Sequence, residues 1–299
     1  MNISYTINEN DNFENVKDVL KRYFQISDRL LLKLKTNNKI FLNNNIVNVK
    51  SSVKVNDIIS FSLDFEENNF NIVSTKMNLN IVYEDEYYLV VDKPANMATH
   101  PSILHYENSL SNGIKYYFDS INLKKKIRPV NRLDRDTSGL VIFAKNEYIQ
   151  ECLIKQMNNH NFHKEYIGIV CGCFDNDIGT IDLPIARKNN SIIERCIDFE
   201  KGDRSVTHYK VIESNSDFSV VKFILETGRT HQIRVHCAYL EHPIVGDTLY
   251  GTNSQYINRQ ALHSYKISFI HPITHSKVEY TSDSYKIHFI DLLNLIEKK

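Results

Sequence analysis

The hydrophobic pattern of the first 63 residues predicts two helices followed by short strands. Apolar residues recur at helical spacing over residues 13–24, and Ser27 has the residue type of an N-cap before a second apolar repeat. An Asn-rich turn then separates two apolar pairs, which is typical of a β-hairpin. The predicted elements are helices over residues 13–24 and 27–34, a hairpin of residues 40–42 and 46–47, and a strand within residues 55–63.

Beyond residue 80 the pattern changes to a mixture of strands and helices without strict alternation, which favours an α+β fold over a doubly wound parallel sheet. The change of character falls in residues 65–79, so we expect two domains, residues 1–70 and 80–299. The predicted strands are residues 81–83, 88–91, 139–145, 166–171, 207–212, 219–225 and 261–269, and the predicted helices are residues 110–118, 148–157 and 231–240.

Composition is that of a globular protein, with 42% hydrophobic and 24% charged residues among 299, which argues against disordered and fibrous classes. The net charge is zero, so the chain does not coat nucleic acid by bulk charge. Residues 12–63, however, carry nine Lys and Arg against four Asp and Glu, an excess of +5. That excess fits a surface that follows RNA phosphates, and it fits a solvated helix face equally well.

The five cysteines are loosely spaced, which favours reduced thiols. The N-terminus has no basic and apolar leader, and the apolar runs are too short to cross a bilayer. We therefore expect a cytoplasmic protein without a membrane partner.

Residues 128–145 hold the most informative chemistry in the chain. Two arginines and two carboxylates, Arg132, Asp134, Arg135 and Asp136, come just before the apolar run 140–144. Charges placed ahead of a core strand are held on a rigid base. Composition alone would also allow a charged surface turn.

The segment R-L-D-R-D-T-S-G-L at residues 132–140 resembles the signature of the RluA family of RNA pseudouridine synthases. The resemblance implies that Asp134 is the catalytic nucleophile. It also implies that Arg132 enters the RNA in place of the extracted base. Asn131 stands where the family often has His, which puts a histidine role there in doubt.

Three further segments resemble motifs of the same family in the same order. They are residues 92–102, with Lys93 and His100, residues 164–166, with Lys164 and Tyr166, and residues 225–236, with Leu225 and Arg229. The resemblance covers residues 80–299 almost without gaps.

By this resemblance Tyr166 and Leu225 contact the target base, and Arg229 pairs with the catalytic carboxylate. Lys93, His100 and Lys164 are counted among the substrate-binding residues. Tyr166 as simple core and Arg229 as a surface residue are the plainer alternatives.

The N-terminal unit resembles the small S-four-like RNA-binding domain, through its two helices and the hairpin that follows Lys39. The family usually has Gly where this chain has Asn38 and Asn56. Asn tolerates left-handed backbone better than most residues, so we expect both turns to survive.

The function implied is isomerisation of uridine in RNA, on a mixed, mainly antiparallel sheet flanked by helices and loops, without a cofactor. No metal is expected, because no carboxylate or thiol completes a set with His231 and His236. Large-subunit ribosomal RNA is the first expected partner and transfer RNA the second, with Lys124, Lys125 and Lys126 as candidate phosphate contacts and a monomer as the expected state. A non-catalytic RNA-binding assembly factor and a nucleoside glycosidase are the competing interpretations.

Overall fold

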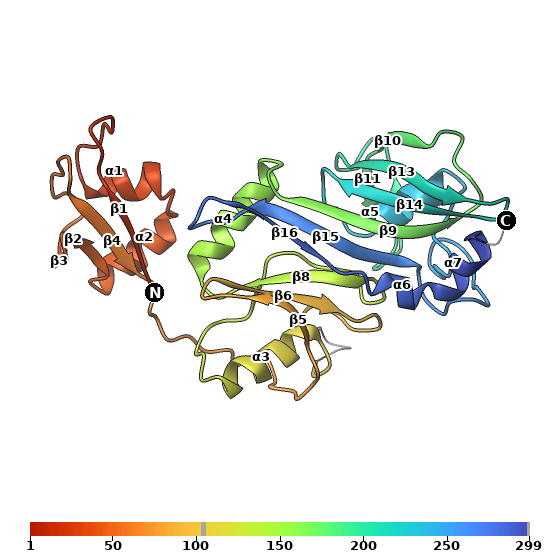
Figure 1. Cartoon of the computed structure of the whole chain (residues 1–299), viewed down its shortest axis with the longest axis horizontal. Helices are drawn as coiled ribbons and strands as arrows, with labels where there is room; N and C mark the ends of the chain where they lie inside the picture. Colours follow the sequence, from red (N-terminus) through yellow and green to blue (C-terminus); the bar gives the residue numbers. More distant parts are fainter. Residues whose placement is uncertain (103–105, 298–299) are drawn as a thin grey trace.

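The computed structural model of the protein describes residues 1–102 and 106–297. Residues 2–62 form a four-stranded antiparallel sheet in the order β1-β4-β2-β3, with short helices against it (Figure 1). The elements are β1 (Asn2–Thr6), α1 (Val16–Asp18), the π-helical turn η1 (Val19–Tyr23), α2 (Asp28–Thr36), β2 (Ile40–Leu42), β3 (Asn45–Ile46) and β4 (Ile58–Ser62).

The turns of this unit depend on asparagine in the left-handed conformation. Asn38 and Asn56, which stand where the resembled domain has glycine, have φ of 53° and 71°. The hairpin turn is made by Asn43 and Asn44, with φ of 49° and 65°. The predicted cap of the second helix is confirmed, because Ser27 Oγ accepts a hydrogen bond from the Leu30 amide at 3.2 Å. The expected turns therefore form without glycine.

The N-terminal unit packs against helix α4 (Glu147–Asn158) of the larger part of the chain. The rings of Phe61 and Tyr148 meet edge to face, with centroids 5.4 Å apart. Lys33 Nζ lies 2.6 Å from a carboxylate oxygen of Glu147 and 3.4 Å from one of Glu67. One hydrophobic cluster therefore runs through both units.

The segment that follows β4 and leads out of the N-terminal unit is bound to residues 124–128 through residues 63–67. Arg128 donates two hydrogen bonds to the Glu67 carboxylate, at 2.7 and 2.8 Å. Lys125 Nζ donates to the carbonyl oxygens of Leu63 and Phe65. The expectation that Lys125 contacts RNA phosphates is therefore wrong in this structure, because its ammonium group already holds the connecting segment.

The rest of the chain is built on a ten-stranded sheet in the order β10-β13-β14-β9-β15-β8-β6-β5, with β16 beside β15 and β7 beside β8 (Figure 1). All strand pairs are antiparallel except β8 with β15. The strands are β5 (Asn80–Glu84), β6 (Tyr88–Lys93), β7 (Arg128–Pro129), β8 (Ser138–Ala144), β9 (His163–Cys171), β10 (Ile178–Asp182), β13 (Val206–Ser214), β14 (Phe218–Leu225), β15 (Leu262–Ile270) and β16 (Lys277–Thr281). The remaining helices are α3 (Leu110–Ser120), α5 (Gln232–Tyr239), α6 (Tyr285–His288) and α7 (Ile290–Glu297). This is the expected α+β class.

Strand β8 is buried on both faces. Alternate residues point to opposite sides of a strand, so Ile142 joins the hydrophobic cluster that contains α4. Val141 joins the second cluster, which contains Leu110 and Ile114 of α3. The loop that enters β8 is therefore anchored on the most buried strand of the sheet.

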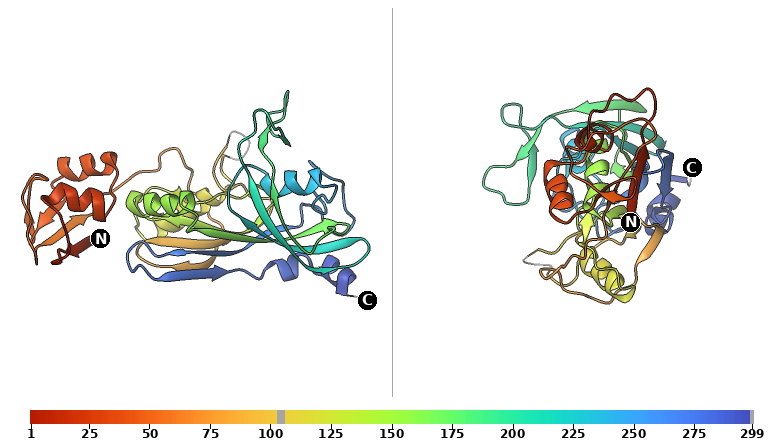
Figure 2. Two further views of the ribbon diagram at one scale, coloured as in Figure 1. Left: turned by 90° about the horizontal axis from the view of Figure 1, so that it is seen from above. Right: turned by 90° about the vertical axis from the view of Figure 1, so that its left-hand side faces the viewer.

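The predicted strands and helices occur within a few residues of their expected positions. The sequence analysis did not predict β1, β7, β10, β16, α6 and α7, nor the two-stranded arm of β11 (Ile185–Arg187) and β12 (Arg195–Ile197). The arm stands away from the main sheet (Figure 2). No helix in the described ranges is long and apolar enough to cross a membrane.

Candidate active site

The first residues of the loop 131–138 are fixed by buried hydrogen bonds. Asn131 Nδ2 donates to the Leu140 carbonyl oxygen, and Asn131 Oδ1 accepts from the Ile142 amide. Thr99 Oγ1 accepts from the Leu133 amide and donates to its carbonyl oxygen. The asparagine that replaces the usual histidine therefore ties the loop to β8.

Gly139 is required where the loop enters β8. Its φ is +115°, which residues with a side chain rarely adopt, and an added Cβ would lie 2.3 Å from the carbonyl oxygen of Ser264. The close approach of β8 to β15 at this position leaves no room for a side chain.

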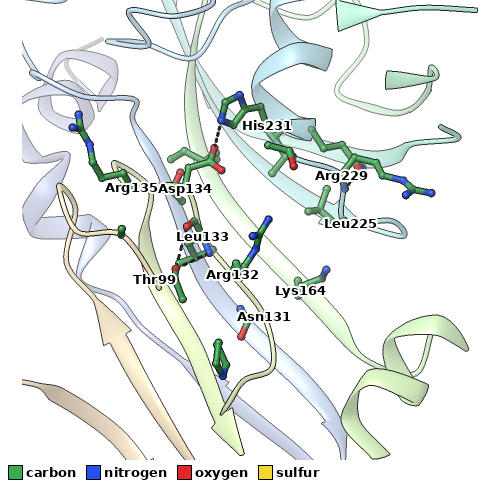
Figure 3. A pocket seen from close by; sticks show the side chains of 18 of the residues that line it. Thr99, Asn131, Arg132, Leu133, Asp134, Arg135, Lys164, Leu225, Arg229 and His231 are labelled. Carbon is green, nitrogen blue, oxygen red and sulfur yellow. Dashed lines mark hydrogen bonds and ion pairs between the residues drawn. The ribbon is translucent and has the colours of Figure 1, made fainter. Parts of the chain in front are cut away.

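The Asp134 carboxylate faces the basic side chains at the start of α5. Arg234 Nη1 donates to Asp134 Oδ2 at 3.0 Å, and His231 Nε2 lies 3.8 Å from the same oxygen (Figure 3). Arg234 also makes two hydrogen bonds to Asp247, at 2.6 and 2.8 Å. Burial lowers the pKa of Arg234, but Asp247 and Asp134 outweigh burial and raise that pKa. A permanent positive charge is therefore locked beside the carboxylate.

The expectation that Arg229 pairs with Asp134 is wrong in this structure. Arg229 is exposed and turned away from Asp134 (Figure 3), and its Nη1 lies 3.2 Å from Asp203. The reason is the position of the helix start, since Arg229 precedes α5 while Arg234 lies within its first turn. Arg234 belongs to the same sequence motif, but its spacing from Arg229 alone does not distinguish the two.

Tyr166 and Leu225 form apolar walls of a cavity of about 620 Å³ that Asp134 lines. Tyr166 pairs with Phe223 across β9 and β14, and Leu225, two residues further on, points to the same side of the sheet. Burial and the Asp134 charge raise the pKa of Tyr166, so its phenol stays protonated. The structure thus brings the expected nucleophile and both expected base-contacting residues together.

Arg132, His100 and Lys164 lie around the same cavity (Figure 3 labels Arg132 and Lys164). Arg132 and His100 are exposed, and His100 Nδ1 lies 3.1 Å from Ser111 Oγ. Lys164 is partly buried, and burial lowers its pKa. All three side chains therefore line the cavity that Asp134 also lines.

The assignment of Lys93 to substrate binding is wrong in this structure. Its side chain is fully buried, and its Nζ donates to the carbonyl oxygens of Pro94, Met97 and Arg135. Burial lowers the pKa of Lys93 to about 7, although Asp134 raises it. Lys93 therefore ties the loop that carries Asp134 to residues 94–97.

His231 and His236 diverge. His236 is buried between Thr207 and the Leu183 carbonyl oxygen, far from the contacts of His231. Within residues 1–102 and 106–297, no three His, Cys, Asp or Glu side chains converge as a metal site would require.

Comparison with known proteins gives consistent results. A family model described as RNA pseudouridylate synthase matches residues 87–239. A Bacillus subtilis (strain 168) protein, "Uncharacterized RNA pseudouridine synthase YjbO", is 39% identical, with 85% of this chain and 90% of that protein covered. "Ribosomal large subunit pseudouridine synthase D" of Vibrio cholerae is 32% identical, with 81% of this chain and 78% of that protein covered.

Among solved structures, "Human RNA Pseudouridylate Synthase Domain Containing 1" superposes with a TM-score of 0.58 at 26% identity. The match covers 74% of this chain and 96% of that one. Together with the motif around Asp134, these matches show that the chain belongs to the RNA pseudouridylate synthase family, in its RluA branch, and is an isomerase.

Proposed function

We propose that this protein converts specific uridines to pseudouridine in large-subunit ribosomal RNA, with Asp134 as the nucleophile. The observation that carries the proposal is the charge pattern of the cavity. Asp134 is the one carboxylate among its described lining residues, and the five cations of that lining are Arg132, Arg135, Lys164, Arg229 and Arg234. A polyanion is attracted to such a cavity, and Arg234 forms an ion pair with the Asp134 carboxylate within it.

The isomerisation sets the chemical requirements of the site. The bond from ribose C1′ to uracil N1 breaks, and a bond from C1′ to C5 forms. C5 then loses its proton, and N1 gains one. The uracil ring must turn between these steps without leaving, so the apolar walls of Tyr166 and Leu225 are suited to hold it. No group other than the chain's own side chains enters this sequence.

The target uridine must first leave its stack, at a cost of roughly a few kcal/mol. Arg132 is exposed at the cavity beside the nucleophile, with its neighbour Leu133 pinned by Thr99. If the Arg132 guanidinium occupied the place that the uracil leaves in the RNA stack, its stacking on the neighbouring nucleobases would offset part of that cost.

We further propose that residues 1–70 are an S-four-like RNA-binding domain attached to a synthase domain of residues 80–299. The exposed basic residues of this domain include Lys17, Arg29, Lys35, Lys50 and Lys54. None of these five side chains makes an ion pair with a described residue. Their ammonium and guanidinium groups are therefore free to contact phosphates.

The choice of ribosomal RNA rests on similarity to relatives named for that substrate, such as the Vibrio cholerae protein described above. Pseudouridine mapping of total RNA from a strain without the gene tests it. Loss of pseudouridine at large-subunit positions supports the proposal, whereas loss confined to transfer RNA makes transfer RNA the substrate.

Two assays, one on the same strain and one on purified protein, set a synthase apart from the two competing interpretations. An assembly factor without catalysis would leave all pseudouridines in place. A glycosidase would release free uracil from RNA incubated with the purified protein, and a synthase would release none.

A further inference from the structure

His231 stands at the N-cap position of α5, but its side chain does not cap the helix. It precedes α5 with φ of 58°, a left-handed conformation that histidine adopts more often than most residues, and makes no capping hydrogen bond to the helix. The neighbouring Gln232 side chain accepts from the Arg229 amide instead. The imidazole is therefore directed elsewhere, and only 11% of it is exposed.

Both ring nitrogens of His231 face polar partners. Nδ1 lies 2.8 Å from the hydroxyl of Tyr250, and Nε2 lies 3.8 Å from Asp134 Oδ2. The Tyr250 hydroxyl also accepts a hydrogen bond from the backbone amide of Arg195, at 2.8 Å. Since an amide can only donate, the Tyr250 hydroxyl accepts from it and keeps its own proton available to donate to His231 Nδ1.

This arrangement selects one tautomer of the imidazole. Burial lowers the pKa of His231, and Arg234 and Arg195 lower it further, although Asp134 and Asp247 raise it. The ring is therefore neutral and carries one proton. With Nδ1 acting as the acceptor, that proton lies on Nε2 and faces Asp134.

The two contacts to the Asp134 carboxylate fall on one oxygen. Arg234 and His231 both approach Oδ2, and Oδ1 accepts no hydrogen bond from the described residues. We propose that His231 is a positioning residue, whose Nε2, oriented by Tyr250 and 3.8 Å from Oδ2, closes the Oδ2 side of the carboxylate together with Arg234 and leaves Oδ1 for the target uridine. This inference rests on the proposed role of Asp134 as the nucleophile.

Three substitutions separate positioning from mere packing. His231→Gln brings an amide nitrogen to the place of Nε2. His231→Asn suits the left-handed backbone, but its amide reaches only as far as Nδ1. Tyr250→Phe keeps the ring that packs on Arg234 and removes only the hydroxyl.

The single-turnover rate is measured by tritium release at saturating RNA. The substrate is [5-³H]uridine-labelled total RNA from a strain without the gene. We expect His231→Asn and Tyr250→Phe to lose about tenfold in rate, because the Oδ2 side of the carboxylate is then open, and His231→Gln to retain most of it. Equal rates for the Asn and Gln variants would overturn the inference.

Two readouts are insensitive to a purely structural role. In ¹⁵N-histidine-labelled protein, long-range ¹H–¹⁵N correlation should show His231 protonated at Nε2, and Tyr250→Phe should yield a mixture of tautomers. The pH–rate profile of His231→Gln should have the same shape as the wild-type profile. A wild-type Nδ1–H tautomer, or a change in the shape of the pH–rate profile, contradicts positioning by a neutral imidazole.

Asp134→Asn is assayed in parallel. If it stays active, the proposed nucleophile is wrong. If it is inactive while His231→Asn keeps the full rate, only the inference about His231 fails.

Discussion

Arg234 and Asp134 lie one hundred residues apart in the sequence, and their side chains meet at 3.0 Å. Arg234 is held from its other side by Asp247, whose side chain is 1% exposed. Asp134 thus faces a cation that cannot move away without leaving a second carboxylate buried and unpaired.

We predict that Arg234→Ala abolishes detectable turnover and lowers the free energy of unfolding by about 3–5 kcal/mol, because it leaves Asp247 buried without a partner. Arg229→Ala is the matched control, and it should lower the rate only several-fold. Tritium release and urea unfolding measure the two effects. The opposite ranking of the two variants would restore Arg229 as the partner of the nucleophile.

Asp134→Asn should reduce the single-turnover rate at least about a thousandfold, as for other covalent nucleophiles, while RNA affinity stays near wild type. Asp136→Asn is the control, because Asp136 lies two residues away and pairs with Arg135 at the surface. The control should keep most of the activity. Comparable losses in both variants would indicate a damaged loop and not a lost nucleophile.

Gly139→Ala should be strongly destabilising, by roughly 2–4 kcal/mol, because the added methyl meets the backbone of Ser264 and the residue must keep a positive φ. Gly228→Ala is the comparison. Gly228 is exposed and its Cβ would meet only the flexible end of Lys164. Thermal unfolding of both variants measures the difference, and equal stability would show that β8 and β15 can separate at this point.

The Glu67–Arg128 pair predicts a dependence of stability on pH. Burial acts to raise the pKa of Glu67, but Arg128 and Lys33 outweigh it, and the pKa falls to about 2 from an ordinary 4.5. A carboxyl group with a depressed folded-state pKa stabilises the protein above its unfolded pKa. That contribution is lost as pH falls from about 4.5 to about 2.

Glu67→Gln should therefore lower the free energy of unfolding at pH 7 by about 1–3 kcal/mol. The difference from wild type should shrink steadily below pH 4.5. Urea unfolding at a series of pH values tests this. A difference that stays constant down to pH 3 would show that the carboxylate charge contributes nothing.

Charge reversal on α2, by Arg29→Glu with Lys35→Glu, should weaken RNA binding and flatten its dependence on salt, since each lost phosphate contact reduces that slope by about one. The single-turnover rate at saturating RNA should change less than about tenfold, because binding energy far from the reacting atoms acts through affinity. Fluorescence anisotropy at several salt concentrations measures the slope. An unchanged affinity and slope would make residues 1–70 a structural module.

Several features of this protein were predictable from sequence alone, because they depend on local chemistry. The motif around Asp134 identified the family. Ser27 was recognisable as an N-cap, because a Ser hydroxyl just before an apolar helix commonly accepts a hydrogen bond from an amide of the first turn. The left-handed turns at Asn residues were predictable for the same reason, because Asn itself tolerates a positive φ better than most residues.

Other features were decided only by the tertiary structure. Arg229 and Arg234 belong to one motif, and which of them meets Asp134 depends on where α5 begins and on Asp247, which approaches from a separate loop. Lys93 has a motif position typical of a site residue, yet its neighbours in space bury it completely. Residue type and spacing determine which groups are available, and long-range packing determines which of them face the cavity and which support it.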